Sequence, residues 1–428
     1  MNKFTRALAL ILSLCTLSVL PAAAAGADDE DAMRGVWVSS VYNLDYPSVQ
    51  TTDAAALRRE ADAILDNCAQ WGINAVFLQV RPTSDALYDS DIFPWSRYLT
   101  GSQGTAPADN FDPLEYWIDE AHDRGIELHA WINPYRITRA GATDWDDVSP
   151  DNPAAEHPEW VIEYGGNYYY DPGLPAVREM VIEGAVEIAR NYDVDGIHLD
   201  DYFYPGTDFN DDVTYARYGG GLSLADWRRD NVNQLVEGLH DALAKYDVTF
   251  GISPSGIWAN QSTDPRGSAT AGSEHYVKSY ADSLCWIENG WIDYIVPQIY
   301  WEIGHSLADF ATLADWWQTA VKGSNVKLYI GMPAYRCTDA TSGVWMTSDP
   351  LFQNLDYLAQ NNLSEGCVYF RYGSLRDVPG LSSRLTAWYG VDHPAVVPPH
   401  GDGDAAGASG LTRTFGDIFN KLLLSMIR

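Results

Sequence analysis

Short apolar runs alternate with longer segments of helical periodicity along most of the chain. Many of the runs have a period of two, in which alternate positions are aliphatic, as in strands that pack against helices on one face. Strands are predicted over residues 34–40, 74–82, 126–134, 195–201, 248–256, 293–301, 327–335 and 366–374. Helices are predicted between and after them, over residues 53–71, 113–124, 175–192, 223–246, 274–289, 308–322, 350–361 and 375–388.

This alternation predicts an α/β protein with the fold of a (β/α)8 TIM barrel. A doubly wound open sheet gives the same alternation, but its Gly-rich phosphate motif is missing after the first strand, where Ser39-Ser40-Val41-Tyr42 stands. Long insertions follow the third and fourth strands, at residues 136–173 and 202–222. Because barrel enzymes bind substrates at the C-terminal ends of their strands, we expect these insertions to shape a substrate cleft. The alternative is that they only cover the barrel mouth.

The two ends of the chain differ from the barrel. Residues 1–27 have the basic, apolar and small-residue regions of a secretory signal, which predicts a secreted or cell-envelope-associated protein. A catalytic domain is predicted over residues 33–390, followed by a Pro/Gly/Ala linker at 391–410 and a short amphipathic helix at 411–428. Weak contact of this locally basic helix with a membrane surface is one hypothesis; docking on the barrel or disorder is the other.

The net charge indicates which class of partner the chain can bind, and the cysteine spacing indicates whether the chain holds disulfides or a metal. With 59 acidic and 27 basic side chains the formal net charge is −32, which excludes a nucleic-acid partner and favours a neutral or amino-sugar glycan. The cysteines beyond residue 27 match no zinc spacing and lie on elements too far apart to pair, so we expect free thiols and no metal or cofactor. These cysteines are Cys68, Cys285, Cys337 and Cys367.

The strand alternation also predicts which side chains face the barrel interior. Aliphatic positions should meet the helices, so the polar positions between them point inward. In the fourth strand this rule turns Asp200 inward and leaves Asp201 at the start of the loop. The other side chains expected near the strand ends are Trp37, Ser39, Phe77, Gln79, Arg81, His129, Trp131, Asn133, His198, Ser253, Gln298, Tyr300 and Arg371.

Adjacent carboxylates at a barrel mouth suit glycoside hydrolysis, in which one group protonates the leaving oxygen and the other attacks the sugar or activates water. The chain also has 16 Trp and 26 Tyr, whose rings can stack on sugar faces. Structural roles are the alternatives: Asp201 capping a loop, Asp200 pairing with Arg81 or Arg371, and His198 as a hydrogen-bonded core residue.

A metal site is the competing chemistry. Asp200, Asp201 and His129 offer ligands of the kind used by metal-dependent deacetylases and hydrolases. No HExxH motif or close histidine cluster accompanies them. The paired-carboxylate hypothesis is therefore preferred.

Six motifs resemble, in order, those of glycosyl-hydrolase-like family 10: RGVWVSS, FLQVRPTSDALYDSDIFPWSRYLTG, HAWINPYR, DGIHLDDYFYP, GISPSGIW and DYIVPQIYW. The likeness runs from about residue 33 to residue 388. It implies a TIM-barrel glycosidase of the bacterial envelope or exterior, acting on peptidoglycan glycan strands or a related polysaccharide. Asp200 and Asp201 would be its catalytic carboxylates. Its sugar site would include Arg81, Asn133, Tyr135, Gln298, Tyr300 and Trp301.

DGIHLDDYFYP is also similar to the DGxDxDxE signature of chitinases, but it departs from that pattern at two positions. His198 replaces the middle Asp, and Tyr202 replaces the catalytic Glu. If Asp201 does not supply the acid, Glu302 after the sixth strand is the second choice. Trp37, His129, His198, Tyr202 and Arg371 complete the predicted substrate contacts. A carbohydrate-binding barrel without turnover is the alternative function.

Overall fold

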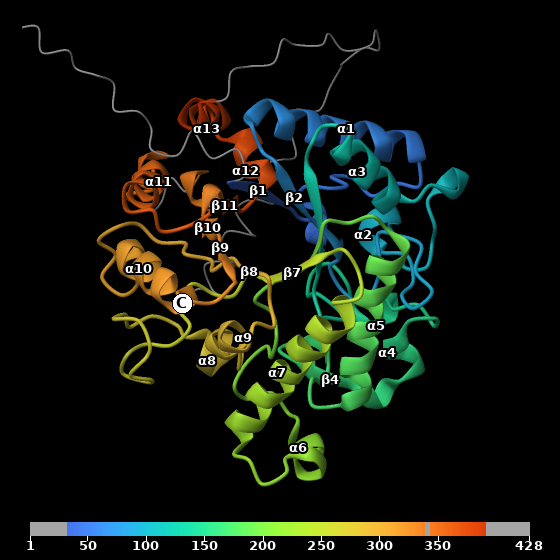
Figure 1. Ribbon diagram of the computed structural model, residues 1–428. Coiled ribbons are helices and arrows are strands. Elements are labelled where there is room, and N and C mark those ends of the chain that lie inside the picture. Colours follow the sequence, from blue (N-terminus) through green and yellow to red (C-terminus); the bar gives the residue numbers. More distant parts are fainter. Residues whose placement is uncertain (1–31, 339–342, 391–428) are drawn as a thin grey trace, which may run out of the picture.

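The computed structural model describes residues 32–338 and 343–390, which form a barrel of parallel strands surrounded by helices (Figure 1). The sheet order is β10-β11-β1-β2-β3-β6-β7-β8-β9, and each neighbouring pair in it is parallel. Its strands are β1 (Met33–Val38), β2 (Ala75–Arg81), β3 (Glu127–Ile132), β6 (Gly196–Leu199), β7 (Thr249–Ile252), β8 (Tyr294–Ile295), β9 (Lys327–Leu328), β10 (Ile330–Met332) and β11 (Gly366–Tyr369).

The two ends of this sheet are halves of a single strand. β9 and β10 are separated only by Tyr329, yet β9 pairs with β8 and β10 pairs with β11. The seventh predicted strand therefore joins both edges of the sheet. A closed (β/α)8 barrel of eight strands results, so the predicted TIM-barrel fold is confirmed.

Helices cover the outside of the barrel (Figure 1). Those that follow the prediction closely are α1 (Ala54–Trp71), α3 (Pro113–His122), α5 (Pro175–Asn191), α7 (Leu224–Leu243), α10 (Phe310–Val321) and α11 (Asp349–Asn361). Local chemistry sets their ends. The side chain of Asp53 accepts from the first-turn amides of α1, and Gly72 ends that helix at φ 76°.

Two predicted helices are each broken in two. The segment 274–289 forms α8 (His275–Lys278) and α9 (Ser283–Asn289), with Tyr280 between them at φ 56°. The segment 375–388 forms part of α12 (Tyr372–Asp377) and α13 (Leu381–Tyr389), with Gly380 at φ 77°. A left-handed residue ends a helix, so neither segment could continue as predicted.

All of the predicted strands extend past the observed C-terminal ends, and the sixth and eighth do so most. β8 covers only Tyr294–Ile295, and the chain beyond it keeps contact with the sheet through isolated bridges from Gln298 to Ser255 and Gly331. β11 ends at Tyr369, and α12 begins three residues later. Arg371 therefore lies in the short connection between β11 and α12 and not on a strand, which corrects its predicted placement.

The long insertions have structure of their own. The segment after β3 contains α4 (Pro153–Glu156) and the antiparallel hairpin β4 (Val161–Tyr164) and β5 (Asn167–Tyr170). The segment after β6 contains α6 (Asp212–Tyr218), which lies at the edge of the molecule (Figure 1). A buried ion pair between Asp211 and Arg228 fastens this insertion to α7. Short elements outside the insertions are α2 (Arg97–Thr100) and the 3-10 turns Val41–Asn43, Ala108–Asn110 and Ala334–Thr338.

The barrel interior is filled by large rings near its middle. Trp37, Phe77, Trp131, Tyr294 and Tyr329 belong to one buried cluster inside the strands, separate from the larger core between strands and helices. The four cysteines beyond residue 27 are free, three of them buried and Cys285 partly exposed. No helix in the described ranges is long and apolar enough to cross a membrane. The predicted signal, linker and C-terminal helix lie outside the described residues.

Candidate active site

A cavity of about 520 Å³ opens at the C-terminal end of the barrel. Loops after β1, β3, β6, β7 and β8 supply its wall, which is the face where TIM barrels place their chemistry. The predicted strand-end residues that line it are Trp37, Ser39, Gln79, Trp131, Asp200, Asp201, Ser253, Gln298 and Tyr300, and the predicted substrate contacts Tyr202 and Trp301 line it as well.

Asp200 follows directly on β6 and is almost completely buried, at 3% exposure. Its carboxylate accepts hydrogen bonds from Trp131 Nε1 at 3.1 Å, from Asn133 Nδ2 at 3.1 and 3.2 Å, and from the Tyr202 amide at 3.2 Å. Burial raises the pKa of Asp200 to about 6, a rise that Arg136 opposes and Asp201 supports. All of its partners are N–H donors, so the site accommodates the ionised form.

Asp201 begins the loop and is partly exposed to the cavity. Its Oδ1 accepts from Gln298 Nε2 and its Oδ2 from Ser255 Oγ, both at 3.2 Å. Burial again raises the pKa, and the bonds from Gln298 and Ser255 lower it. The neighbouring carboxylates thus lie on one cavity with different partners: fixed N–H donors at Asp200, and an amide and a hydroxyl at Asp201.

The two predicted histidines lie beneath this pair, inside the barrel. His198 Nε2 lies 3.3 Å from Trp37 Nε1, which can only donate, so Nε2 accepts and Nδ1 donates to the Tyr294 hydroxyl at 3.2 Å. Burial lowers the pKa of His198 well below its ordinary value, so the ring is neutral. His129 stacks on Phe77, with ring centroids 4.6 Å apart. Neither ring lines the cavity, and both act as hydrogen-bonded core residues.

Arg81 does not face the cavity, which corrects the predicted inward direction. The pairing of β2 with β3 shifts between Gln79 and Arg81, and such a bulge moves the following side chain to the other face. The Arg81 guanidinium lies 4.4 Å from the Phe93 ring, and a Cβ added to Gly184 of α5 would lie 2.3 Å from its Nη1. It is therefore buried between the barrel wall and α5.

Three other predicted residues also point elsewhere. Tyr135 is buried in the core outside the barrel. Glu302 accepts from Trp345 Nε1 at 2.8 Å, and its side chain does not line the cavity. Asn133 lies behind Asp200, so it contacts the carboxylate and not the cavity.

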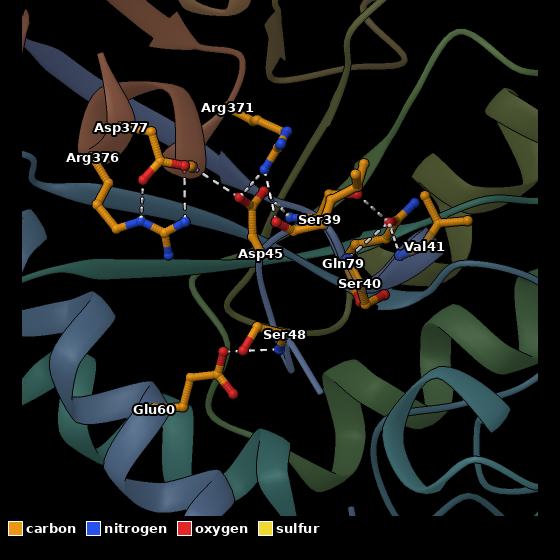
Figure 2. Close-up of polar contacts among 12 residues, drawn as sticks. Ser39, Ser40, Val41, Asp45, Ser48, Glu60, Gln79, Arg371, Arg376 and Asp377 are labelled. Atoms are coloured by element: carbon orange, nitrogen blue, oxygen red, sulfur yellow. Dashed lines mark hydrogen bonds and ion pairs between the residues drawn. The ribbon is translucent and has the colours of Figure 1, made fainter. Parts of the chain in front are cut away.

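Arg371 organises the loop after β1 (Figure 2). It forms an ion pair with buried Asp45 and donates to the Leu44 carbonyl at 2.8 Å. Asp45 also accepts from the Ser39 amide at 3.0 Å. These contacts fix a loop whose residues Ser39 and Leu44 line the cavity, so Arg371 acts on the site from outside it.

Gln79 is the second anchor of this loop (Figure 2). Its Oε1 accepts from Ser39 Oγ at 2.9 Å, from the Ser40 amide at 3.1 Å and from the Val41 amide at 3.0 Å. The side chain itself lines the cavity. The inward position predicted for Gln79 therefore serves the loop after β1 as well as the site.

Sequence reasoning missed several residues of the cavity wall. Arg136 is buried with its guanidinium 4.4 Å from the Tyr202 ring, and its charge lowers the pKa of both carboxyl groups. Its position at the end of the HAWINPYR motif was the signal that could have found it. His275 and Ser255 come from the segment after β7, and Tyr164 and Asp208 from the two long insertions. Ser255 lies within the GISPSGIW motif, and Tyr164 and Asp208 lie in the insertions expected to shape the cleft, whereas no local pattern marks His275.

The ligand set for the competing metal chemistry is not assembled. Asp200 and Asp201 lie at the cavity, whereas His129 lies in the interior layer below them. Within residues 32–338 and 343–390, no group of three or more His, Cys, Asp or Glu side chains has the arrangement of a metal site.

Comparisons with known proteins show the family of the chain. The family described as Glycosyl hydrolase-like 10 matches residues 32–347. Glycosyl hydrolase YngK of Bacillus subtilis (strain 168) is 42% identical over 426 residues, which cover 97% of this chain and 82% of that protein. Glycosyl hydrolase DigH of Escherichia coli (strain K12) is 41% identical over 324 residues, which cover 71% of this chain and 73% of that one.

Among solved structures, the PgaB (BpsB) glycoside hydrolase domain from Bordetella bronchiseptica matches with a TM-score of 0.55 and 13% identity, over 84% of this chain and 99% of that one. Alpha-L-fucosidase isoenzyme 2 from Paenibacillus thiaminolyticus matches with a TM-score of 0.50 and 14% identity, over 84% of this chain and 49% of that one. These two likenesses show the fold alone. The family match over residues 32–347 and the two glycosyl hydrolase relatives lead to one conclusion: the chain belongs to the glycosyl hydrolase-like 10 family and is an enzyme of the glycoside hydrolase class.

Proposed function

We propose that the protein is an exported glycoside hydrolase that cleaves O-glycosidic bonds of an amino-sugar glycan, with peptidoglycan glycan strands as the leading substrate. The observation that carries the proposal is the pair Asp200 and Asp201 on one cavity wall, each with its own set of hydrogen-bond partners. Export is supported by the signal-like residues 1–27. The substrate is supported by the acidic surplus of the chain and by the motif resemblance.

Asp200 is the nucleophile or base of this proposal. Trp131, Asn133 and the Tyr202 amide can only donate to it, and donors of this kind stabilise a carboxylate over a carboxylic acid. The ionised Asp200 attacks the anomeric carbon, or removes a proton from the water that does so, while the bond to the leaving oxygen breaks.

Asp201 is the general acid. Its partners are the Gln298 amide and the Ser255 hydroxyl, and a hydroxyl can accept as well as donate, so a protonated carboxyl group keeps its contacts. It gives its proton to the glycosidic oxygen as the leaving sugar departs. Burial raises the pKa of this group as it raises the pKa of Asp200, so the assignment of the acid rests on the hydrogen-bond partners.

Aromatic side chains support a carbohydrate substrate. The cavity wall includes Trp37, Tyr42, Tyr169, Tyr300 and Trp301. Rings of this kind offer flat apolar faces that stack on the apolar faces of sugars. A site that recognised only small polar molecules would not need so much aromatic surface.

The proposal is tested by incubating the full-length mature protein with purified peptidoglycan glycan strands, chitin oligomers and neutral plant glycans. Mass spectrometry then detects new reducing ends. Release from amino-sugar glycans alone is the expected result, and cleavage confined to neutral glycans would reject the substrate assignment. Binding measured by calorimetry with no product from any glycan would instead identify a carbohydrate-binding barrel without turnover.

A further inference from the structure

The direction of Asp201 depends on groups outside its own strand. It lies two residues beyond the end of β6, where strand geometry no longer fixes a side chain. Ser255 and Gln298 hold its carboxyl group at 3.2 Å each. Gln298 Nε2 also donates to the Ser253 carbonyl at 3.0 Å, which fixes the orientation of its amide. These contacts leave the main chain at Asp201 to be fixed by another group.

His275 provides that contact. Its Nε2 lies 2.8 Å from the main-chain carbonyl oxygen of Asp201, across 74 positions of sequence. A carbonyl oxygen only accepts, so Nε2 carries the hydrogen and Nδ1 has none. His275 is buried at 2% exposure, lines the cavity, and packs against Phe203 with the rings tilted by 47° and their centroids 6.0 Å apart.

The other ring nitrogen indicates that the contact is not incidental. His275 Nδ1 is buried and has no hydrogen-bond partner in the described part of the chain. A buried acceptor without a donor lowers the stability of the fold. An apolar side chain would avoid that cost, so the ring is best explained by what its Nε2 does.

The ring is also electrically neutral. Burial lowers the pKa of His275 to about 4, so it carries no proton on Nδ1 near neutral pH. A positive charge next to Asp201 would favour the ionised carboxylate and weaken an acid. A neutral imidazole can hold the main chain without that effect.

The helix that carries His275 is firmly attached to the loop after β7. The His275 amide donates to the Ile257 carbonyl and the Tyr276 amide to the Trp258 carbonyl, each at 3.0 Å. The Glu274 carboxylate accepts from the Asn260 amide at 2.9 Å. Because the same loop carries Ser255, the imidazole and the hydroxyl that contact Asp201 belong to one rigid unit.

We propose that His275 is a positioning residue for the general acid: its Nε2 hydrogen bond fixes the main chain at Asp201 so that Ser255 and Gln298 hold the carboxyl group against the leaving oxygen. The inference rests on the acid role of Asp201 in the proposed function. It adds a residue whose ring acts through Asp201 and does not itself transfer a proton.

Substrates with different leaving groups distinguish a positioning role of His275 from a purely structural role. A 2,4-dinitrophenyl glycoside needs no proton on its leaving oxygen, whereas a sugar leaving group does. His275→Leu should lower kcat about 10- to 100-fold on the cleaved glycan, the scale of a misplaced catalytic group. On the dinitrophenyl glycoside of the oligosaccharide that the wild type releases, its kcat/KM, which reports only the steps up to departure of the leaving group, should change less than about threefold.

Two further variants sharpen the test. His275→Gln keeps an N–H donor within reach of the Asp201 carbonyl and should recover part of the lost kcat. His157→Leu is the matched control, because that ring stacks on Trp160 outside the cavity, with centroids 4.0 Å apart, and its loss should leave both substrates unaffected.

Equal loss of activity on both substrates in His275→Leu would overturn the inference, and so would unchanged activity on the glycan. Circular dichroism and thermal melting of each variant show whether an equal loss comes from the fold. If the wild type cleaves no glycan, the proposed function itself is wrong and the positioning role falls with it. That outcome is distinct from the first two, because it appears before any variant is compared.

Discussion

Asn133 donates from its amide nitrogen to both carboxylate oxygens of Asp200, at 3.1 and 3.2 Å. Its own oxygen accepts from the Arg136 amide at 3.0 Å, so the amide has a single orientation. The side chain of Asn133 therefore connects the end of β3 to the carboxylate at the end of β6. The geometry of the proposed nucleophile or base depends on this neighbour as well as on its own strand.

Asn133→Ala should lower kcat about 10- to 100-fold, because Asp200 loses a donor that both orients it and stabilises its charge. KM should change much less. Asn231→Ala is a control of equal burial, since Asn231 bonds the Tyr204 hydroxyl away from the carboxylates; it should cost stability and leave kcat nearly unchanged. Equal kcat values for Asn133→Ala and the wild type would contradict the account.

The pH dependence should follow the raised pKa of Asp200. Because this group must be ionised to act, and because burial raises its pKa to about 6, activity should fall as the pH drops through about 6. An ordinary aspartate would keep its activity down to about pH 4. Measuring kcat/KM from pH 4 to pH 8 separates the two cases, and an acidic limb near pH 4 would speak against a buried base.

The two insertions meet over the cavity at Gly206. A Cβ added there would lie 2.1 Å from the Tyr164 hydroxyl, which donates to Asp208 at 2.6 Å. Gly206→Ala should therefore push the hairpin tip aside and raise KM roughly fivefold, the scale of one hydrogen bond, with kcat retained. Gly343→Ala meets no atom within 4 Å and is the control. An unchanged KM would show that substrate does not reach this wall.

Arg81→Met should leave catalysis intact, because the guanidinium lies between the barrel wall and α5. Its Nη1 and Nη2 make no hydrogen bond with a described residue, so an apolar replacement should leave the melting temperature unchanged or raise it. Arg228→Met is the comparison: equally buried, but paired with Asp211, it should cost about 3–5 kcal/mol. Loss of activity in a well-folded Arg81→Met variant would indicate that Arg81 contributes to the sugar site, as the sequence predicts.

Strand alternation predicted the barrel and the place of Asp200 because the flanking Ile197 and Leu199 are plainly aliphatic. The same rule failed at Arg81. The β2–β3 pairing aligns Gln79 with Trp131 and then Arg81 with Ile132, so one residue is inserted without any change in the apolar pattern. A bulge of this kind depends on the neighbouring strand, which a local pattern does not contain.

Contacts between distant loops explain the other differences. Glu302 was a reasonable second acid by position, but its carboxylate contacts Trp345, 43 residues further on. His275 reaches Asp201 from a helix that the periodicity merged with α9. The sequence pattern thus predicts the barrel and its carboxylates. The groups that orient these carboxylates come from loops that are distant in sequence and pack together only in the fold.

The most direct test of the account is cleavage by Asp200→Asn and Asp201→Asn, measured as new reducing ends on the glycan that the wild type degrades. Both variants should fold and bind the glycan but lose at least about 100-fold in kcat, the lower range for one acid or base group. Asp195→Asn makes the same change at the opposite end of β6 and should stay active. Near wild-type cleavage by both cavity variants would contradict the paired-carboxylate mechanism.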